Sequence, residues 1–268
     1  MNEKLRFCWT IAAVILLTLL LAPYQALAHW TGWMDPTAAP RLWYRCAARI
    51  LRLRIHTFGR VEEGRPLLIA ANHSSWTDVI VLGSIFKGSF IAKGEVGRWP
   101  VVGFLAQLQG TVLVDRQNKR SSGSQVSELA GKLAGGRAML LFAEGTTSDG
   151  TNILPFKTTL FGAAKTAVTE AGAPEVLIQP VAIAYTRTGG LPMGRRLRGL
   201  CAWTGDEELL PHLTTLLRLP PIDVEVHWGE PVAFTATTDR KTASREVEQR
   251  VRAMFAAALA TPVPSSRG

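Results

Sequence analysis

Leu67-Leu68-Ile69-Ala70-Ala71-Asn72-His73-Ser74-Ser75-Trp76-Thr77-Asp78 is the stretch of sequence that decides the fold. Its first five residues are all apolar, which predicts a strand buried on both faces of a sheet. The polar residues after the strand lead into a helix expected over 76–86. Ligands of α/β sheets bind where such strands end. We therefore expect a functional site in the turn after residue 71.

The same alternation of strand and helix patterns continues along the chain. It favours an α/β fold with a twisted, mostly parallel sheet of about seven strands flanked by helices. The expected strands are 55–58, 67–71, 89–92, 111–114, 138–142, 177–184 and 224–228, and the expected helices are 76–86, 99–108, 121–134, 159–170 and 244–260. We expect a surface loop over 186–198 and a disordered tail over 261–268.

The composition indicates a folded, basic protein. Of 268 residues, 47% are hydrophobic and 19% are charged, which excludes an intrinsically disordered chain. The formal net charge of +9 indicates an anionic partner, either nucleic acid or a lipid surface. The sequence contains no zinc-finger spacing, aromatic RNA-binding box or basic helical arm, so we expect no nucleic acid partner. Three widely separated cysteines indicate a reducing compartment.

The N-terminal segment predicts a hydrophobic helix over 7–28, which contains no charged residue. About 20 such residues cover the hydrocarbon core of a bilayer, about 30 Å thick. Lys4 and Arg6 before the apolar run, with Ala26-Leu27-Ala28 after it, also fit a cleaved signal peptide. The basic segment that follows favours the anchor.

A basic amphipathic helix is expected next, over 40–54. One face carries arginines and the other is mostly apolar, as in helices that lie at a membrane surface. The alternative is an ordinary surface helix that packs on the domain. We expect a membrane anchor over 1–58, a catalytic domain over 59–260 and the tail after it. The arginines favour the inner (cytoplasmic) membrane, with the domain on its cytoplasmic face.

His73 and Asp78 are the candidate catalytic residues. A histidine titrates near neutral pH and can take a proton from an alcohol. Asp78, about one turn into the next helix, could orient the imidazole and stabilise its charged form. Alternatively, Ser75-x-x-Asp78 is only a capping box at the start of the helix, and His73 is a loop residue.

Two further strands are expected to end in polar residues. Strand 138–142 leads into Glu144-Gly145-Thr146, where glycine allows a ligand to approach the backbone. Strand 111–114 leads to Arg116, whose guanidinium could bind an anionic head group. Lys93 and Lys157 are additional cations at the ends of apolar segments. The alternatives are ordinary strand-ending turns and solvated surface cations.

Taken in order, these stretches resemble the lysophosphatidate acyltransferase family, also called the phospholipid/glycerol acyltransferase family. Four blocks between residues 67 and 185 carry the resemblance: Asn72-His73 with Asp78 for N-H-x4-D, Gly110 with Arg116 for G-x5-R, 142–148 for F-P-E-G-T-R-S, and the apolar segment 178–183 around Pro180.

The resemblance implies that His73 removes a proton from an acceptor hydroxyl, which attacks the thioester of acyl-CoA or acyl-carrier protein, and that Asp78 orients His73. It implies no cofactor and no metal. The substrate-binding positions that we expect are Asn72, Lys93, Arg116, Glu144, Gly145, Thr146 and Lys157. The donor thioester and the oligomeric state stay open.

The expected acceptor is a lysophospholipid such as 1-acyl-glycerol-3-phosphate, which would give phosphatidic acid. Ala143 and Thr147 depart from the family pattern, and Thr147 removes an arginine from the head-group pocket. The segment 144–150, Glu-Gly-Thr-Thr-Ser-Asp-Gly, followed by Leu154-Pro155-Phe156-Lys157, resembles the lyso-ornithine lipid acyltransferase branch. The acceptor hydroxyl of that branch belongs to an amide-linked 3-hydroxy fatty acid. An alternative function of a different class is a membrane-surface lipid-binding protein without turnover. Such a protein would have no need of His73 and Asp78.

Overall fold

A single nine-stranded sheet lies at the centre of the protein. The computed structural model describes residues 2–98, 103, 106, 109–114, 119–204 and 207–260, and of residues 98 and 119–124 it describes the backbone alone. In chain order the elements are α1 (Glu3–Thr31), α2 (Ala38–Ile50), β1 (Leu53–Phe58), β2 (Leu67–Ala71), α3 (Thr77–Ile85), β3 (Ser89–Lys93), the 3-10 helix η1 (Gly94–Arg98), β4 (Val112–Val114), α5 (Lys119–Ala134), β5 (Met139–Phe142), the 3-10 helix η2 (Thr158–Phe161), α6 (Gly162–Thr169), β6 (Val176–Thr188), β7 (Leu191–Pro192), α7 (Arg195–Cys201), α8 (Leu209–Arg218), β8 (Ile222–Trp228), β9 (Val232–Phe234) and α9 (Arg240–Ala260).

Seven strands follow one another across the sheet in the order β1-β8-β6-β2-β5-β3-β4, and β7 and β9 pair with β6. Each pair of neighbours in this order is parallel except β6 with β8. Because β1 and β8 run together against the others, the sheet is mixed but mostly parallel. This confirms the α/β class expected from the sequence.

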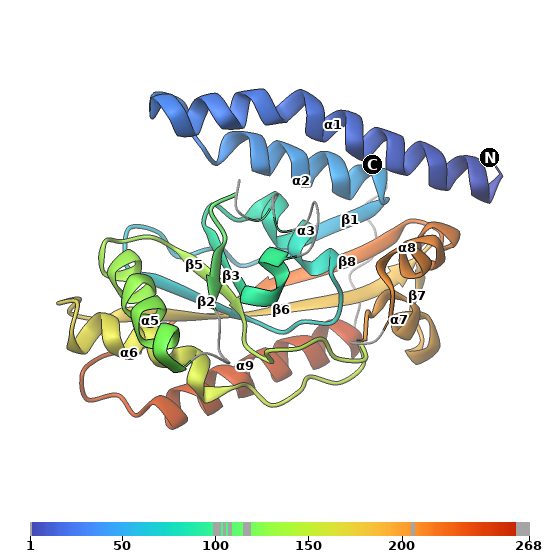
Figure 1. Ribbon diagram of the computed structural model, residues 1–268. Helices are drawn as coiled ribbons and strands as arrows, with labels where there is room; N and C mark the ends of the chain where they lie inside the picture. The colour runs from blue at the N-terminus through green and yellow to red at the C-terminus, as the bar shows by residue number, and fades with distance from the viewer. Residues whose placement is uncertain are drawn as a thin grey trace.

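Helices cover both faces of the sheet (Figure 1). On β2, Leu67, Ile69 and Ala71 face the core that α2, α3 and α8 enclose, while Leu68 and Ala70 face the core formed with α5, α6 and α9. This alternation follows from the two-residue period of a strand. A strand with five fully buried residues therefore needs five consecutive apolar side chains, and 67–71 supplies them.

The expected loop over 186–198 is wrong. Strand β6 continues to Thr188, a tight turn at Gly189-Gly190 reverses the chain, and β7 pairs back onto β6 before α7 begins at Arg195. Both glycines have positive φ angles, 58° and 84°, a conformation that glycine adopts at no steric cost. Glycines that predict a loop therefore form a hairpin turn here.

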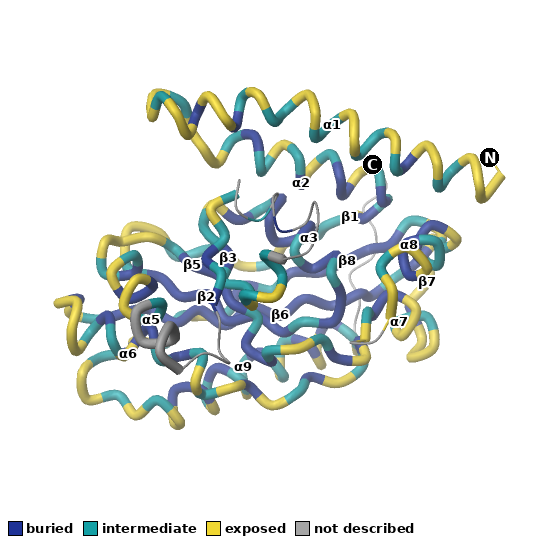
Figure 2. Tube along the Cα trace, in the orientation of Figure 1, coloured by how far each residue is buried: buried dark blue, intermediate teal, exposed yellow. Residues whose placement is uncertain are grey.

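The N-terminal helix α1 is longer than expected and lies largely outside the protein core (Figure 2). Its most apolar 18-residue stretch has a mean hydropathy of 2.2, and only 6% of that stretch is buried. By length and composition this helix could cross a membrane, a property that signal sequences share. Exposed Leu16, Leu19 and Leu20 give it an apolar surface that no other described element covers.

Helix α2 packs on the domain, which is the alternative that the sequence left open. It lies between α1 and α3 (Figure 1), and it buries Tyr44, Ala47 and Ala48 in the core. The helix ends at Ile50 rather than at 54, because Leu53 already belongs to β1. Strand β1, which the expected boundary at residue 58 assigned to the anchor, is an edge strand of the sheet.

Some expectations fall on residues outside the described part of the chain. Arg116 and the tail over 261–268 belong to these residues. Of the helix expected over 99–108, only Gly103 and Ala106 are described, and both are helical. The cysteines Cys8, Cys46 and Cys201 are free thiols.

Candidate active site

Asn72 joins the turn after β2 to the neighbouring strand β6. Its side-chain Nδ2 donates to the backbone oxygen of Ile183 (3.0 Å), and the Ile183 N–H donates to Asn72 Oδ1 (2.7 Å). The backbone register between β2 and β6 ends at Ala71 and Val181, so the amide side chain replaces the next pair of strand hydrogen bonds. Asn72 is buried, and its place in the site is therefore fixed by β6.

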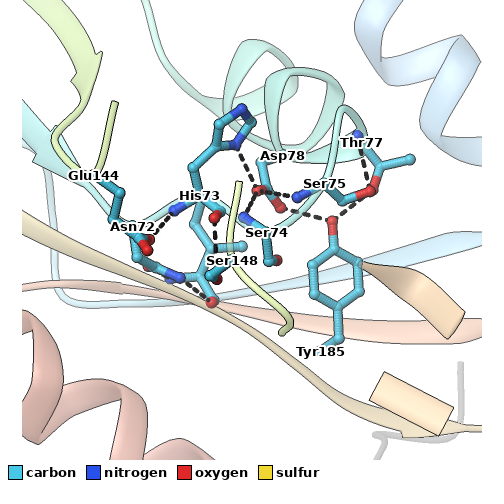
Figure 3. A network of polar contacts seen from close by, with 10 residues as sticks. Asn72, His73, Ser74, Ser75, Thr77, Asp78, Glu144, Ser148 and Tyr185 are labelled. Atoms are coloured by element: carbon cyan, nitrogen blue, oxygen red, sulfur yellow. Dashed lines mark hydrogen bonds and ion pairs between the residues drawn. The ribbon is translucent and has the colours of Figure 1, made fainter. Parts of the chain in front are cut away.

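His73 and Asp78 form the hydrogen bond that the motif predicts. His73 Nδ1 lies 2.9 Å from Asp78 Oδ2 (Figure 3). Asp78 is fully buried, whereas 17% of the His73 side chain is exposed. A carboxylate can only accept a hydrogen bond, so the proton of the neutral ring sits on Nδ1. The second nitrogen, Nε2, points away from Asp78 and makes no hydrogen bond within the described part of the chain, and it is free to accept a proton.

Asp78 also binds the backbone of the turn that leads into helix α3. Its Oδ2 accepts the backbone N–H groups of Ser74 (2.7 Å) and Ser75 (2.9 Å). Both residues are buried, so water does not satisfy these donors. One carboxylate therefore orients the histidine and makes the acid's half of the expected capping box, the bond to the Ser75 N–H, whereas Ser75 Oγ binds Thr77.

Tyr185 binds the other oxygen of Asp78, a contact that the sequence did not predict. The Tyr185 hydroxyl donates to Asp78 Oδ1 (2.7 Å) and lies 2.6 Å from Thr77 Oγ1. Burial, followed by the nearby charge of Asp78, raises the pKa of Tyr185 well above its usual value. The hydroxyl therefore remains protonated and donates to the carboxylate.

Glu144 holds two backbone segments in place beside His73. Its Oε1 accepts the His73 N–H and its Oε2 accepts the Leu154 N–H, each at 2.6 Å. The residue is fully buried, and burial raises the pKa of this carboxyl to about 7, against the two hydrogen bonds that lower it. Both oxygens of Glu144 thus bind the backbone of the site, and its binding of substrate stays a prediction.

The segment after Glu144 closes on the other side of His73. Ser148 donates its backbone N–H (2.8 Å) and its hydroxyl (3.1 Å) to the backbone oxygen of His73. The His73 ring stacks on Phe142 at the end of β5, with the ring centroids 3.8 Å apart. Contacts to the backbone and to one ring face thus hold His73 in a single orientation. Ser148 was in the resembling segment, but its partner could not be inferred from spacing.

Helix α8 and the segment before it contact Ser74 and Trp76, between His73 and Asp78. Trp76 Nε1 donates to His212 Nδ1 (2.9 Å), and His212 Nε2 lies 2.8 Å from the backbone oxygen of Ala202. His212 is therefore neutral with its proton on Nε2, and burial lowers its pKa. The next residue, Trp203, donates its N–H to the backbone oxygen of Ser74 (2.7 Å). A pattern of leucines at helical spacing over 209–217 could have predicted α8, but not this contact.

The remaining expected binding residues lie at the carboxyl ends of β3 and β5. Gly145 has a φ of 71° and forms the turn after Glu144. Lys93 is the last residue of β3, and the Lys157 N–H binds the backbone oxygen of Ala143 (2.8 Å), one residue after β5. Both lysine side chains are exposed, as is Thr146. Within the described residues, no three His, Cys, Asp or Glu side chains form a group that could hold a metal ion.

Comparison with known proteins relates this arrangement to one family. The family described as Acyltransferase matches residues 52–184, which contain His73, Asp78 and Glu144 but not Tyr185, Trp203 or His212. A lyso-ornithine lipid O-acyltransferase of Brucella abortus is 51% identical over 261 residues, 97% of each chain. The chain belongs to the acyltransferase family.

Two other acyltransferases and a solved structure extend the comparison. A lyso-ornithine lipid O-acyltransferase of Rhizobium meliloti is 43% identical over 90% of this chain and 83% of its own. A 1-acyl-sn-glycerol-3-phosphate acyltransferase of Neisseria gonorrhoeae is 30% identical over 73% of this chain and 74% of its own. The crystal structure of the 1-acyl-sn-glycerophosphate acyltransferase of Thermotoga maritima shares the fold, with a TM-score of 0.66 at 19% identity, over 98% of this chain and 100% of that one.

Proposed function

We propose that this acyltransferase moves a fatty acyl group from a thioester to the free hydroxyl of a lysolipid, and that the lysolipid is a lyso-ornithine lipid. The observation that carries the proposal is the 2.9 Å bond between His73 Nδ1 and buried Asp78, which leaves Nε2 as a proton acceptor at the edge of the sheet. A binding protein without turnover would have no use for this arrangement.

The proposed reaction needs no acyl-enzyme and no cofactor. His73 Nε2 accepts the proton of the acceptor hydroxyl while the hydroxyl oxygen attacks the carbonyl carbon of the thioester. The tetrahedral intermediate collapses, the C–S bond breaks, and the departing thiolate takes the proton from the imidazolium. The products are an ester and a thiol. Asp78 stabilises the imidazolium while it exists, because its negative charge lies 2.9 Å from Nδ1.

The choice of acceptor rests on similarity and on Thr147. The relatives named for lyso-ornithine lipid are 51% and 43% identical to this chain, against 30% for the relative named for 1-acyl-sn-glycerol-3-phosphate. Thr147 stands where the family pattern has an arginine, so the site has one cation fewer for a phosphate monoester. Exposed Lys93 and Lys157 at the same edge remain to bind the carboxylate of an amino-acid head group.

We further propose that α1 holds the domain at the inner membrane, on its cytoplasmic side. The exposed leucines of α1 would lie in the hydrocarbon, and the exposed Arg49 of α2 would face anionic head groups. A lysolipid acceptor resides in that bilayer, so the reaction would take place at its surface. The acyl donor, acyl-CoA or acyl-carrier protein, would arrive from the cytoplasm.

The test offers lyso-ornithine lipid and 1-acyl-glycerol-3-phosphate side by side to the purified full-length protein in detergent. Each acceptor is paired in turn with acyl-CoA and with acyl-carrier protein. We expect ester product from lyso-ornithine lipid and none above background in the His73→Ala variant. Product from 1-acyl-glycerol-3-phosphate alone would overturn the acceptor, and equal product from His73→Ala would overturn the role of His73.

A further inference from the structure

Asp78 is a buried carboxylate whose two oxygens have very different surroundings. Oδ2 accepts three hydrogen bonds, from His73 Nδ1 and from the backbone of Ser74 and Ser75. Oδ1 accepts one within the described part of the chain, from the hydroxyl of Tyr185 at 2.7 Å. The Tyr185 hydroxyl therefore decides how the carboxylate is turned and how much of its charge is left for His73.

The proton of Tyr185 has one possible destination. An ionised carboxylate cannot donate, so Tyr185 donates to Asp78, and its hydroxyl oxygen also lies 2.6 Å from Thr77 Oγ1. Thr77 Oγ1 also lies 3.0 Å from Ser75 Oγ. The buried hydroxyls of Ser75, Thr77 and Tyr185 thus lie next to one another beside Asp78 (Figure 3), and that of Tyr185 donates to Oδ1.

Strand β6 fixes the position of Tyr185. Two residues earlier, Ile183 exchanges two hydrogen bonds with Asn72, and so the strand is fastened to the same turn that carries His73. Immediately after Tyr185 the pairing of β6 with β8 shifts register, before Arg187. Such irregularities reorient side chains near functional sites. Tyr185 is 3% exposed, so its hydroxyl cannot exchange Asp78 for water.

We infer that Tyr185 is a positioning residue for acyl transfer, which holds Asp78 Oδ1 so that Oδ2 faces His73 and which draws charge from the carboxylate to set the basicity of His73. This inference rests on the proposed role of His73 as the base. Without the hydroxyl, Asp78 would carry more charge toward His73, and the imidazolium would become more stable.

The experiment compares Tyr185→Phe with Tyr44→Phe in the full-length protein. Tyr44 is also buried, and its hydroxyl binds Gln109, so the control removes the same group from another part of the core. We expect Tyr185→Phe to lower kcat about tenfold at unchanged KM, because Asp78 is no longer held with Oδ2 facing His73 and the imidazole loses its fixed orientation. We expect the acidic limb of its kcat–pH profile to move to higher pH, and Tyr44→Phe to keep the wild-type profile.

A double-mutant cycle separates an effect through Asp78 from a loss of structure. In an Asp78→Asn background, Tyr185→Phe should lower kcat no further, because its only route to His73 is already removed. The inference is overturned if Tyr185→Phe keeps the wild-type rate and pH profile, or if it costs as much in the Asp78→Asn background as in the wild type. Either outcome, obtained with an active wild-type protein, would refute only the role of Tyr185. An active His73→Ala variant would instead refute the proposed function.

Discussion

Replacing Asp78 in two ways separates its structural role from its chemical one. Asp78→Ala removes the acceptor of the buried N–H groups of Ser74 and Ser75. Each buried donor left unsatisfied costs about 1–3 kcal/mol, so we expect the free energy of unfolding to fall by about 2–6 kcal/mol. Asp78→Asn keeps a carbonyl oxygen for both donors. Its amide can donate to Tyr185, whose hydroxyl then turns toward Thr77.

The chemical role should appear in the rate of Asp78→Asn. The variant loses a charged hydrogen bond to His73 of about 1.5–3 kcal/mol, which corresponds to a kcat about 10- to 100-fold lower. We expect this loss to be smaller than that of His73→Ala. Urea unfolding gives the stabilities, and initial rates with lyso-ornithine lipid give kcat. A wild-type rate in Asp78→Asn would leave Asp78 with a structural role alone, and a fully stable Asp78→Ala would refute that role.

Three further outcomes are expected. The pKa of Glu144 is about 7 in the folded protein against 4.5 in the unfolded chain, so the native state binds the carboxyl proton more tightly. This difference adds about 3 kcal/mol to the free energy of unfolding below pH 4.5, and the contribution is lost as the pH rises through 7. Glu144→Gln should remove that component from unfolding measured at pH 5 and pH 8; the same pH dependence in both proteins would contradict it. Gly83→Ala should lower the free energy of unfolding in urea by about 1–3 kcal/mol, since its Cβ would overlap the buried Tyr44 ring. An unchanged midpoint would show that the ring moves aside. Deleting residues 2–34 should release the protein from membranes in a flotation assay, and continued flotation would mean that another surface shares the anchoring.

The last of these variants differs from what the sequence alone would suggest. The sequence prediction places the end of the anchor at residue 58, after a helix over 40–54. In the structure, Tyr44 and Ala47 of α2 lie in the core and Leu53 begins the edge strand β1. A deletion through 53 would therefore remove part of the folded domain. The pattern of arginines indicates which face of α2 is polar, but it cannot indicate whether protein or lipid covers the other face.

The main strands were predictable because their burial forces a run of apolar residues. The strand 67–71 agrees residue for residue, and β5 ends at Phe142 as expected. The sequence predicts that the strand from residue 177 ends at Ala184, because the polar Thr186 and Arg187 lie just beyond it, whereas β6 continues to Thr188. Only pairing with β8 and the turn at Gly189 make these residues part of a strand. That information lies in a segment about 40 residues away.

The local part of the site was predictable for a related reason. His73 and Asp78 meet because five residues of turn and helix bring them together, whatever the rest of the chain does. Tyr185 and His212 reach the same turn from 107 and 136 residues away. Neither lies in a pattern with the motif, so only the folded sheet and the docking of α8 place them there. Asn72 is intermediate, since its motif position was evident and its partner Ile183 was not.

The interval between His73 and Asp78 follows from the two demands on one carboxylate. To bind the turn before α3, the acid must stand in the first turn of the helix, where its oxygen reaches back to the backbone N–H groups of Ser74 and Ser75. The residue immediately before these two donors is His73, and its Nδ1 meets the same oxygen. An acid one position later would lie about 100° further round the helix and lose both sets of contacts. Stability of the turn and orientation of the base therefore select the same spacing, and the rate of Asp78→Asn separates the two roles, because that variant keeps an acceptor for both N–H groups.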